Sequence, residues 1–483
     1  MRVIGHDTTL PRQEHAVASG AVTNAKPVVV NSNGTVSIVS GQSEALGTSV
    51  AFESARARYI STVFDSSSNK VVVVYSDQDN SSAGTAIVGT VDSSDNSISF
   101  GSPATFASDA SYISATFDSA NNKVVIGYVD GADNAKGTAI VGTVSGTSIS
   151  FGSAAVFESS AVDSYLHATF DNSNNKVVFA YRDNGNSNYG TAIVGTVSGT
   201  SISFGSAAVF ESASTLYIGA TFDSSNNKVV IVYRDGGNSN YGTAIVGTVS
   251  GTSISFGSPV VFNEAATEGA GAVFDSSNNK VVLAYKNGGN SNYGTAIVGT
   301  VSGTGISFGS PVVLYEEAAE EWSGAFDSDT NQAVFAFYDN GSTTSGQIIV
   351  LQVSGTSVSA SSPTAIFNGR VNYPSVAYDS NTEKSVVSYY TEDGSPAYGY
   401  SVVFQAGATT LTSENYIGIS SNGAADGTTA IIDTKGAIAD NLSSLTPGQS
   451  YFVQTDGTLG TTAADPSVFA GTAVAANKLI VKG

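Results

Sequence analysis

Residues 217–262 read YIGATFDSSNNKVVIVYRDGGNSNYGTAIVGTVSGTSISFGSPVVF, and similar stretches recur along the chain. The recurrence is marked by seven aromatic–aspartate pairs, which begin at Phe64, Phe117, Phe170, Phe222, Phe274, Phe326 and Tyr378. Successive pairs are 53, 53, 52, 52, 52 and 52 residues apart. A period of about 50 residues without helical periodicity is typical of stacked or circular β architectures, in which one unit cannot bury its faces alone.

Each repeat is predicted to contain four strands. In the quoted stretch an apolar segment ends at Phe222, and turns or loops at 223–227, 235–241 and 250–252 separate strands at 228–234, 243–249 and 253–262. The apolar run 229–232 is typical of a strand covered on both faces, and the Asn, Asp, Gly and Ser of the turns suit tight reversals. Four antiparallel strands in about 50 residues predict one blade of a β-propeller. Seven repeats therefore predict an all-β, seven-bladed β-propeller.

The ends of the repeat array predict how the ring closes. The seventh repeat supplies three strands, near Val376, at 386–390 and at 401–405, and then leaves the pattern. We expect the missing fourth strand at 49–54, because Phe52-Glu53-Ser54 matches the outer-strand endings at 157–159 and 210–212. This N-terminal strand would complete the seventh blade and remove an exposed sheet edge.

Two segments lie outside the predicted ring. Residues 27–30 and 35–39 predict a hairpin around Asn33-Gly34, a pair that suits the positive φ angles of a tight turn. A similar unit at 451–454 turns at Asp456-Gly457. We expect an N-terminal arm and β-hairpin at 1–46, a propeller at 47–407 and a C-terminal β-rich module at 408–483, with the two end segments forming one small β domain.

Composition argues against several classes of function. The formal net charge is −21, from 40 acidic and 19 basic residues, whereas nucleic acid and anionic membranes favour Lys and Arg. No apolar run approaches the length of a transmembrane helix, so membrane insertion is not expected, and residues 1–20 lack the apolar core of a secretion signal. The absence of cysteine excludes disulfides and thiolate chemistry.

The C-terminal segment carries a resemblance to a known group of proteins. The stretches SENYIGIS at 413–420, LTPGQSYFVQTDGTL at 445–459, PSVFAGTA at 466–473 and KLIVKG at 478–483 resemble a C-terminal module of structural proteins from tailed bacteriophages, particularly marine and cyanobacterial ones. The repeats resemble those of fibre or virion proteins of the same group. The resemblance implies a virion component, such as a fibre, a spike or a baseplate-associated protein, that is made in the host cytoplasm.

Comparison of the repeats with one another separates scaffold from candidate binding surface. Residues 137–153, 190–206 and 242–258 are identical, and 294–310 differ from them at Gly305 alone. By contrast, the connection that leads into the first strand differs in every repeat. In an up-and-down blade these connections emerge on the same face as the loops between the second and third strands, so both sets of residues are expected on one face.

That face carries the candidate ligand-binding residues. Tyrosines, a lone Trp and carboxylates around a funnel mouth form the kind of surface that binds sugars by stacking and hydrogen bonding. The alternative is drift, because surface loops vary where nothing packs. The candidates are Arg58, Tyr59, Tyr112, Tyr165, His167, Tyr189, Tyr217, Tyr241, Tyr293, Glu320, Glu321, Trp322 and Tyr373.

The densest charge cluster is formed by Glu316, Glu317, Glu320 and Glu321. Paired carboxylates at a suitable separation cleave glycosidic bonds, so a polysaccharide depolymerase is one alternative function. A solvated acidic patch is the simpler interpretation, because no His or Arg constellation recurs around the cluster. The isolated His167 is interpreted as an ordinary first-strand residue rather than as a base.

The remaining motifs predict structure rather than chemistry. Loops 183–188 and 235–240 hold several oxygen side chains, which suit either calcium or an ordinary turn, and no metal or cofactor is assigned to them. The Asp of each aromatic–aspartate pair, such as Asp118 and Asp223, is expected to cap the turn that follows it. The sequence shows no phosphate-binding loop, no nucleophile–base pair and no zinc-ligand spacing.

Together these patterns predict a non-enzymatic virion protein that binds a host-surface glycan or receptor through the varied face of the propeller. Its expected partners are other virion proteins. A homo-oligomer stays open, since no coiled-coil heptads are visible to drive one. The alternatives are the depolymerase tailspike and a purely architectural capsid or tail decoration protein.

Overall fold

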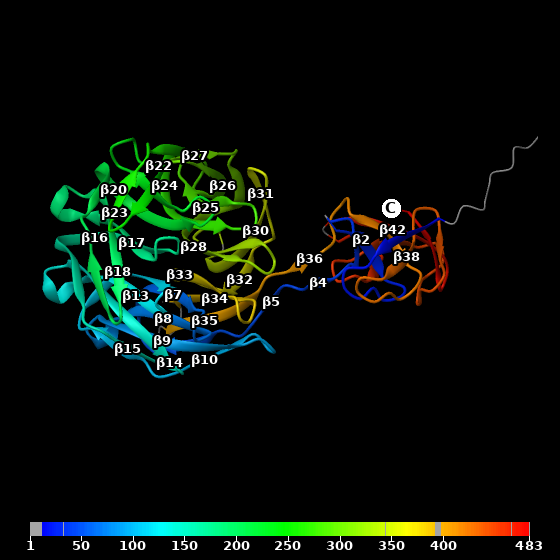
Figure 1. The fold of residues 1–483 in the computed structure, drawn as a ribbon, viewed down its shortest axis with the longest axis horizontal. Helices are drawn as coiled ribbons and strands as arrows, with labels where there is room; N and C mark the ends of the chain where they lie inside the picture. Colours follow the sequence, from blue (N-terminus) through cyan, green and yellow to red (C-terminus); the bar gives the residue numbers. More distant parts are fainter. Residues whose placement is uncertain (1–11, 32, 343, 392–397, 465, 483) are drawn as a thin grey trace, which may run out of the picture. The chain divides into compact units, whose positions relative to one another are not determined.

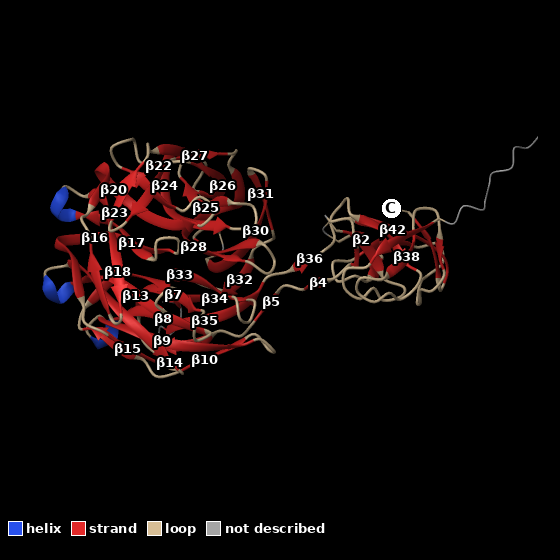
Figure 2. Ribbon diagram, viewed as in Figure 1, coloured by secondary structure: helices blue, strands red, loops and turns tan. Residues whose placement is uncertain are grey.

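The computed structural model describes residues 12–31, 33–342, 344–391, 398–464 and 466–482. The chain divides into two compact units, one formed by residues 45–406 and the other by 1–44 together with 407–483. Both are built almost wholly from β-strands, as the sequence predicts (Figure 2). Three 3₁₀ turns, η1 (Gln78–Asn80), η2 (Gly131–Asp133) and η3 (Asn184–Asn186), follow second strands. The described residues contain no helix long and apolar enough to cross a membrane.

The larger unit contains the seven repeats, and each repeat has a first, a second and a third strand followed by outer segments. The first strands are β7 (Ala57–Asp65), β12 (Ala110–Asp118), β16 (Ala155–Asp171), β20 (Ala208–Asp223), β24 (Val260–Asp275), β28 (Val312–Asp327) and β33 (Val371–Asp379). The second strands are β8 (Lys70–Asp77), β13 (Lys123–Asp130), β17 (Lys176–Asp183), β21 (Lys228–Asp235), β25 (Lys280–Asn287), β29 (Gln332–Asp339) and β34 (Lys384–Thr391). The third strands are β9 (Ala83–Asp92), β14 (Lys136–Ser145), β18 (Tyr189–Ser198), β22 (Tyr241–Ser250), β26 (Tyr293–Ser302), β30 (Ser345–Ser354) and β35 (Tyr398–Gln405). The separate outer segments are β10 (Ser97–Phe100), β11 (Ala104–Ala107), β15 (Ser148–Phe151), β19 (Ser201–Phe204), β23 (Ser253–Phe256), β27 (Gly305–Phe308), β31 (Ser357–Ala360) and β32 (Thr364–Phe367).

The outer strand of a repeat is interrupted and then continues into the next repeat. β22 pairs with β23 along one half and with the start of β24 along the other, whereas the sequence predicts one unbroken strand at 253–262. The interruption lies where neighbouring repeats approach closely, since a side chain at Gly257 would collide with the carbonyl oxygen of Thr304 in the next repeat. Pro259, which lacks an amide hydrogen, is compatible with this break, but the break also occurs where Ala207 takes the place of the proline. β24 runs without a break from Val260 to Asp275. It therefore includes both the end of the outer strand of the fourth repeat and the connection into the fifth repeat.

Burial explains why the second strands read as unbroken apolar runs. In β21, Val229, Val230, Ile231 and Val232 are all 0% exposed. Val229 and Ile231 pack with β17 and β18 of the preceding repeat, whereas Val230 and Val232 pack with β25 of the following repeat. Successive side chains of a strand point to opposite faces of its sheet. The second strand of this repeat is therefore covered on both faces by the neighbouring repeats.

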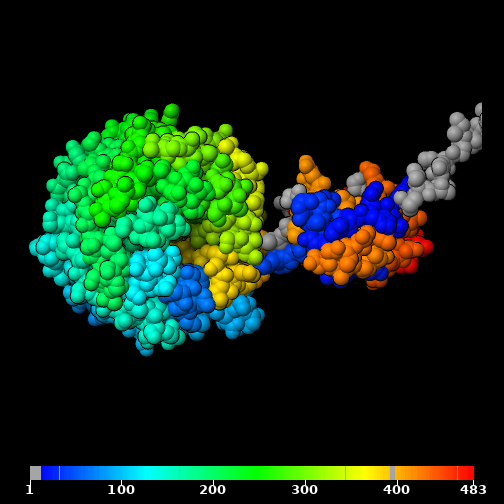
Figure 3. All heavy atoms as spheres, in the orientation of Figure 1, coloured from blue at the N-terminus to red at the C-terminus, as the bar shows by residue number. Residues whose placement is uncertain are grey.

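The first repeat lies against the seventh. β6 (Val50–Glu53) pairs antiparallel with β35, as expected for the N-terminal strand, and β5 (Ala45–Leu46) pairs with the end of the same strand. One apolar cluster joins Val73 of the first repeat to Phe52 of β6 and to Val386 and Val403 of the seventh repeat. The first strands contact one another in chain order, and β33 contacts β7, so the blue and yellow ends of the array meet (Figure 1 and Figure 3). The described strands pair in several sheets rather than in one closed sheet.

The predicted aspartate caps are confirmed. The Asp223 carboxylate accepts hydrogen bonds from the amides of Ser225 and Asn226, at 2.9 Å each. Asp118 accepts from the two corresponding amides of its own turn at 3.0 and 2.9 Å. Both aspartates are 1% exposed, and their hydrogen bonds satisfy the turn amides at the end of each first strand.

The smaller unit joins the two ends of the chain. One sheet has the order β1 (Gln13–Val17), β38 (Thr429–Asp433), β37 (Tyr416–Ser420), β2 (Pro27–Val30) and β3 (Val36–Ile38). A second has the order β39 (Ile438–Ala439), β43 (Lys478–Val481), β42 (Val468–Ala475), β40 (Ser450–Val453) and β41 (Leu459–Gly460), and β4 (Gly41–Gln42) pairs with β36 (Ala408–Thr409). The predicted hairpins at Asn33-Gly34 and Asp456-Gly457 are confirmed by the pairs β2–β3 and β40–β41. Residues 1–11 of the predicted arm and the terminal Gly483 lie outside the described residues.

Phe52→Ala tests whether β6 is an integral strand of the larger unit. Phe52 is 7% exposed, and its ring centroid lies 5.1 Å from that of Tyr75. We expect the substitution to lower the free energy of unfolding by about 3 kcal/mol, because it opens a cavity between the first and seventh repeats. Phe210→Ala, at the corresponding position inside the array, is the control and should cost a similar amount in chemical denaturation. A neutral Phe52→Ala beside a costly Phe210→Ala would show that β6 does not hold the repeat ends together.

Candidate functional site

Every first strand has the same backbone irregularity, six residues before the aspartate that ends the strand. The residues there have φ angles between 47° and 76°, in the left-handed region, and they are Tyr59, Tyr112, Tyr165, Tyr217, Gly269, Glu321 and Tyr373. The pairing of each first strand with its second strand shifts register at this point, for example between Leu216 and Gly219. One β-bulge per repeat therefore re-aims one side chain per repeat.

Five of these seven positions hold tyrosine, and the five belong to the seventh and the first four repeats, whose first strands contact one another in that order. A left-handed backbone costs a residue with a Cβ about 1–2 kcal/mol, and glycine adopts it freely. Gly269 in the fifth repeat shows that glycine is compatible with the position. The fold therefore does not require a side chain at this position, and the tyrosines are present in spite of the cost of their backbone conformation.

The tyrosines converge on one cavity, which we call the mouth. It has a volume of about 470 Å³ and is lined by all five tyrosines together with Glu268, Gly269, Glu320 and Glu321. The residues that follow six of the bulges also line it, namely Ile60, Ile113, Leu166, Ile218, Trp322 and Pro374. Ring centroids lie 4.5 Å apart for Tyr59 and Tyr112, 5.1 Å for Tyr59 and Tyr373, and 4.9 Å for Tyr165 and Tyr217. Burial, with the neighbouring tyrosines, raises the pKa of Tyr59 and Tyr165, so both stay neutral.

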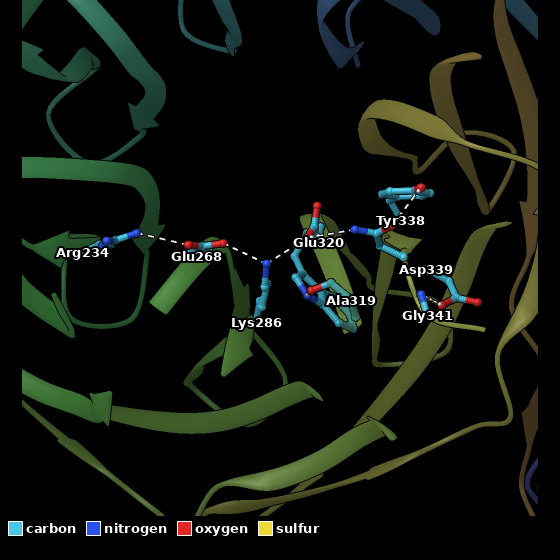
Figure 4. Close-up of polar contacts among 10 residues, drawn as sticks. Arg234, Glu268, Lys286, Ala319, Glu320, Tyr338, Asp339 and Gly341 are labelled. Carbon is cyan, nitrogen blue, oxygen red and sulfur yellow. Dashed lines mark hydrogen bonds and ion pairs between the residues drawn. The ribbon is translucent and has the colours of Figure 1, made fainter. Parts of the chain in front are cut away.

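We call the five tyrosines Tyr59, Tyr112, Tyr165, Tyr217 and Tyr373 the tyrosine arc. The arc is broken in the fifth and sixth repeats, where Gly269 and Glu321 take the place of tyrosine. A line of ion pairs borders this break (Figure 4). Arg234 Nη1 lies 3.2 Å from Glu268, and Lys286 Nζ lies 2.9 Å from Glu268 and 2.8 Å from Glu320. Arg234 also lies over the Tyr217 ring, 5.8 Å from its centroid, so the ion pairs connect the break to one end of the arc.

The two carboxylates at the break have different environments. Burial would raise the pKa of Glu320, but the hydrogen bond and the charge of Lys286 outweigh burial and hold it below its usual range. Burial raises the pKa of Glu321, although its carboxylate accepts a 2.6 Å hydrogen bond from the Tyr373 amide. Glu320 is therefore a fixed anion, and Glu321 is the more readily protonated of the two.

The structure brings some of the predicted residues together and separates others. The predicted residues that line the mouth are Tyr59, Tyr112, Tyr165, Tyr217, Tyr373, Glu320, Glu321 and Trp322. Tyr189, Tyr241 and Tyr293 lie at the starts of third strands on the same end of the repeats, but they are not among the residues that line the mouth. Arg58 precedes Tyr59 and lies opposite Ser76, and it is not among the residues that line the mouth.

Trp322 corrects a sequence expectation. It was expected as an exposed stacking surface, but its side chain is 5% exposed and its ring stacks on Phe337 with centroids 4.3 Å apart. Its Nε1 donates a 3.2 Å hydrogen bond to the carbonyl oxygen of Ala319. The indole packs in the core because the bulge at Glu321 turns the following residue toward the neighbouring second strand.

His167 lies below the mouth rather than in it. It lines a second cavity of about 440 Å³ that shares Tyr165 and Tyr217 with the mouth and extends inward along the first strands. Burial lowers the pKa of His167 to about 4, so its imidazole is neutral at pH 7. The interpretation of His167 as a first-strand residue is confirmed by its place in β16.

The acidic cluster and the predicted calcium loops are divided among separate local contacts. Glu316 is exposed, and the Glu317 side chain accepts a 2.6 Å hydrogen bond from the Ser342 hydroxyl. The Asp183 and Asp235 carboxylates accept amide hydrogen bonds within their own loops. Among the described residues no group of three or more His, Asp or Glu side chains is arranged to hold a metal ion.

Comparisons with known proteins give structural likenesses alone, because no family model and no curated protein matches the chain. The structure of SapL1 lectin in complex with α-methyl fucoside is 15% identical with a TM-score of 0.40, covering 64% of this chain and 95% of that chain. The Aleuria aurantia lectin, described as a six-bladed β-propeller with a novel fucose recognition mode, is 15% identical with a TM-score of 0.39 over 64% and 95% of the two chains. AofleA from Arthrobotrys oligospora is 10% identical with a TM-score of 0.41 over 72% and 96%. Likenesses at this level assign neither a ligand nor a family to the chain.

Sequence reasoning missed two features of this site. Arg234 and Lys286 complete the ion pairs at the break, yet both lie in second strands that otherwise repeat closely. The left-handed backbone position in each repeat was also missed, although its tyrosines, Tyr59, Tyr112, Tyr165, Tyr217 and Tyr373, follow the same 52- or 53-residue period as the aspartate pairs. The glycine at the corresponding position of the fifth repeat is the signal that reveals the backbone conformation.

A pair of substitutions at Tyr217 tests the left-handed backbone. We expect Tyr217→Gly to be more stable than Tyr217→Ala by about 1 kcal/mol, because Ala keeps the strain and Gly removes it. Thermal and chemical unfolding measure the difference. Tyr241, which lies outside the left-handed set, is the control: there the Ala variant should be the more stable one. The same order at both positions would contradict the conformational argument.

The environment of His167 predicts a pH effect on stability. The pKa of His167 is about 4 in the folded chain against an ordinary value of 6.5, so between these values the unfolded chain binds a proton that the folded chain does not. Stability should fall as the pH drops from about 6.5 to 4, with His167 contributing about 2–3 kcal/mol of that loss. His167→Ser, which introduces the residue found at 61, 114, 323 and 375, should remove this contribution from the pH profile of unfolding. Superimposable profiles would contradict it.

Proposed function

We propose that the larger unit is a closed, seven-bladed β-propeller and that its mouth binds carbohydrate without cleaving it. The ring closure is supported by the pairing of β6 with β35 and by the hydrogen bond from the Thr62 amide to Ser375 Oγ, 2.8 Å, which joins β7 to β33. A closed ring gives the first strands a common axis, and the bulges place one side chain from each repeat around it.

The observation that carries the proposal is the tyrosine arc itself. Five consecutive repeats hold tyrosine in a backbone conformation that favours glycine, and strain of this kind at a cavity is typical of functional sites. A tyrosine side chain is rigid and offers an apolar face beside a polar hydroxyl, which matches the faces and hydroxyls of a sugar ring. The arc therefore offers stacking surfaces around a cavity of suitable size for one or two sugar rings.

The carboxylates at the break would fix the orientation of a bound sugar. Glu268 and Glu320 are held in place by Lys286, so their remaining oxygen lone pairs are preorganised acceptors for sugar hydroxyls. Figure 4 shows one carboxylate oxygen of Glu320 directed away from the ion pairs. A sugar that stacks on the arc would place its hydroxyls toward this polar side.

The carboxylates at the break are the strongest argument for the alternative, a depolymerase, because environments that separate two carboxyl pKa values can assign acid and base roles. Against it, Glu320 is paired with a lysine and Glu321 is bound by a backbone amide. Both contacts fix the carboxylates for binding. We therefore propose a non-catalytic site.

We also propose that the chain is a structural component of a tailed-phage particle, with the smaller unit as its anchor to other virion proteins. This part rests on the resemblance of residues 413–483 alone. Proteomic analysis of purified particles from the encoding phage tests it: the chain should be present as a stoichiometric component, and its absence from intact particles would contradict the assignment.

Carbohydrate binding is tested with a glycan array of bacterial surface polysaccharides, followed by calorimetry on the best ligand. A variant with Tyr59, Tyr112 and Tyr165 all changed to Gly should bind at least about 10-fold more weakly, since each stacking contact contributes about 0.5–1.5 kcal/mol. The matched control changes Tyr189, Tyr241 and Tyr293 to Ser and should bind like the parent. The same assay is monitored for new reducing ends.

Three outcomes contradict parts of the proposal. Binding by neither parent nor control, in protein that folds, excludes a glycan site within the panel tested. Binding lost in the control but kept in the mouth variant moves the site to the outer loops. Release of reducing ends that disappears in Glu321→Gln would replace the binding protein with the depolymerase.

A further inference from the structure

The charged residues that line the mouth all have the same sign. They are Glu268, Glu320 and Glu321, and no lysine or arginine is among the described residues that line this cavity. Two of the carboxylates have counter-ions outside the lining, since Lys286 pairs with Glu268 and Glu320, and Arg234 pairs with Glu268. Glu321 forms no ion pair with a described residue. The mouth therefore contains one carboxylate without a counter-ion.

Glu321 lies at the end of the tyrosine arc. Its carboxylate accepts a 2.6 Å hydrogen bond from the amide of Tyr373, the next residue of the left-handed set. Burial raises the pKa of Glu321 more than this hydrogen bond and the charge of Arg370 lower it. The Arg370 guanidinium lies over the Tyr338 ring, 5.7 Å from its centroid, and its Nε donates a 3.1 Å hydrogen bond to Asn372. A cationic ligand would offset the cost of this desolvated carboxylate.

Three tyrosines extend from this carboxylate as one aromatic cluster. Ring centroids lie 5.1 Å apart for Tyr373 and Tyr59, and 4.5 Å apart for Tyr59 and Tyr112. The ring planes meet at 49° and 44°, so the rings do not cover one another's faces as stacked rings would. All three side chains are half-buried and line the mouth. Because the face of an aromatic ring carries partial negative charge, the cluster has the same electrostatic preference as Glu321.

A carboxylate beside several aromatic rings is an arrangement that binds organic ammonium groups. The cation is attracted by the ring faces and by the carboxylate, and the carbon atoms around the nitrogen pack on the rings. An acidic sugar would instead bring its negative charge into a cavity lined by three carboxylates. Arg58 lowers the pKa of Tyr59 through its charge, but it is not among the residues that line the mouth. The lining thus favours a positively charged ligand group.

We propose that Glu321, with Tyr373, Tyr59 and Tyr112, binds an ammonium group carried by the glycan. The group is either the primary ammonium of an amino sugar that lacks its acetyl group or the quaternary ammonium of a choline substituent. This inference rests on the proposed carbohydrate site and names the class of ligand that the site selects.

The experiment compares two pairs of ligands by calorimetry on the full chain, at constant ionic strength and at a pH at which amino sugars are protonated. The first pair is choline and 3,3-dimethylbutan-1-ol, in which carbon replaces the nitrogen. The second pair is a chitosan oligosaccharide and its fully N-acetylated form. In at least one pair the cationic member should bind about tenfold more tightly than the neutral member, and the pair that responds identifies the source of the ammonium group.

Substitutions then locate the charge preference. Glu321→Gln keeps the shape of the side chain and an oxygen that accepts the Tyr373 amide, so it should remove the tenfold preference and leave the affinity for the neutral member unchanged. Glu316→Gln is the matched control, because Glu316 is exposed on the same strand and does not line the mouth, and it should keep the preference. Tyr59→Phe retains the ring and should behave like the parent, whereas Tyr59→Gly should reduce the preference about threefold.

The outcomes separate this inference from the proposed carbohydrate site. Equal affinities within both pairs, or no binding of choline and chitosan by a chain that binds other glycans, would overturn the ammonium preference and leave the carbohydrate site in place. Choline binding without binding of any glycan would keep the ammonium site and contradict carbohydrate binding. Failure of every glycan and probe to bind would overturn both. A preference that survives Glu321→Gln would overturn the role of this carboxylate.

Discussion

The structure depends on one constraint: a sheet whose central strand is apolar on both faces must be covered on both faces. In β21 the side chains alternate, Val229 and Ile231 toward the preceding repeat and Val230 and Val232 toward the following one. Any linear stack of such repeats leaves two apolar faces uncovered. The cluster that packs Val73 of the first repeat against Val386 and Val403 of the seventh buries these two end faces against each other.

The same arrangement creates the candidate site. Adjacent first strands approach closely enough that a side chain on Gly219 would collide with the carbonyl oxygen of Ala270. The bulge in each first strand then releases one residue from the pairing pattern at the mouth. The same strands therefore form the scaffold and the site: their packing repeats from one repeat to the next, whereas the side chains at the mouth vary.

Much of the fold could be predicted from sequence because its signals are local and repeated. The strand pattern of 217–262, the aspartate caps and the N-terminal strand around Phe52 all follow from periodicity, turn chemistry and comparison of repeats. The interrupted outer strand could not be predicted, because the close approach of Gly257 to the Thr304 carbonyl depends on how neighbouring repeats pack.

The candidate site was less predictable for a similar reason. Tyr59 and Tyr189 both lie at the same end of their strands, and composition gives no sign that one lines the mouth and the other does not. Trp322 misled because a lone tryptophan in a variable segment suggests a surface, whereas the bulge before it turns the ring into the core. Pairing of Glu268 with Arg234 and Lys286 joins residues from different repeats, which the spacing within one repeat does not reveal.

The most direct test of the central claim, that ligand contacts the tyrosine arc, is ¹⁹F NMR of the chain with fluorotyrosine incorporated, recorded during titration with the glycan that binds best. Resonances are assigned by single Tyr→Phe substitutions. The account predicts that Tyr59, Tyr112, Tyr165, Tyr217 and Tyr373 shift with a common saturation curve, while Tyr189, Tyr241 and Tyr293 stay unchanged. Shifts confined to those three loop tyrosines, or no shift of the arc at saturating glycan, would contradict it.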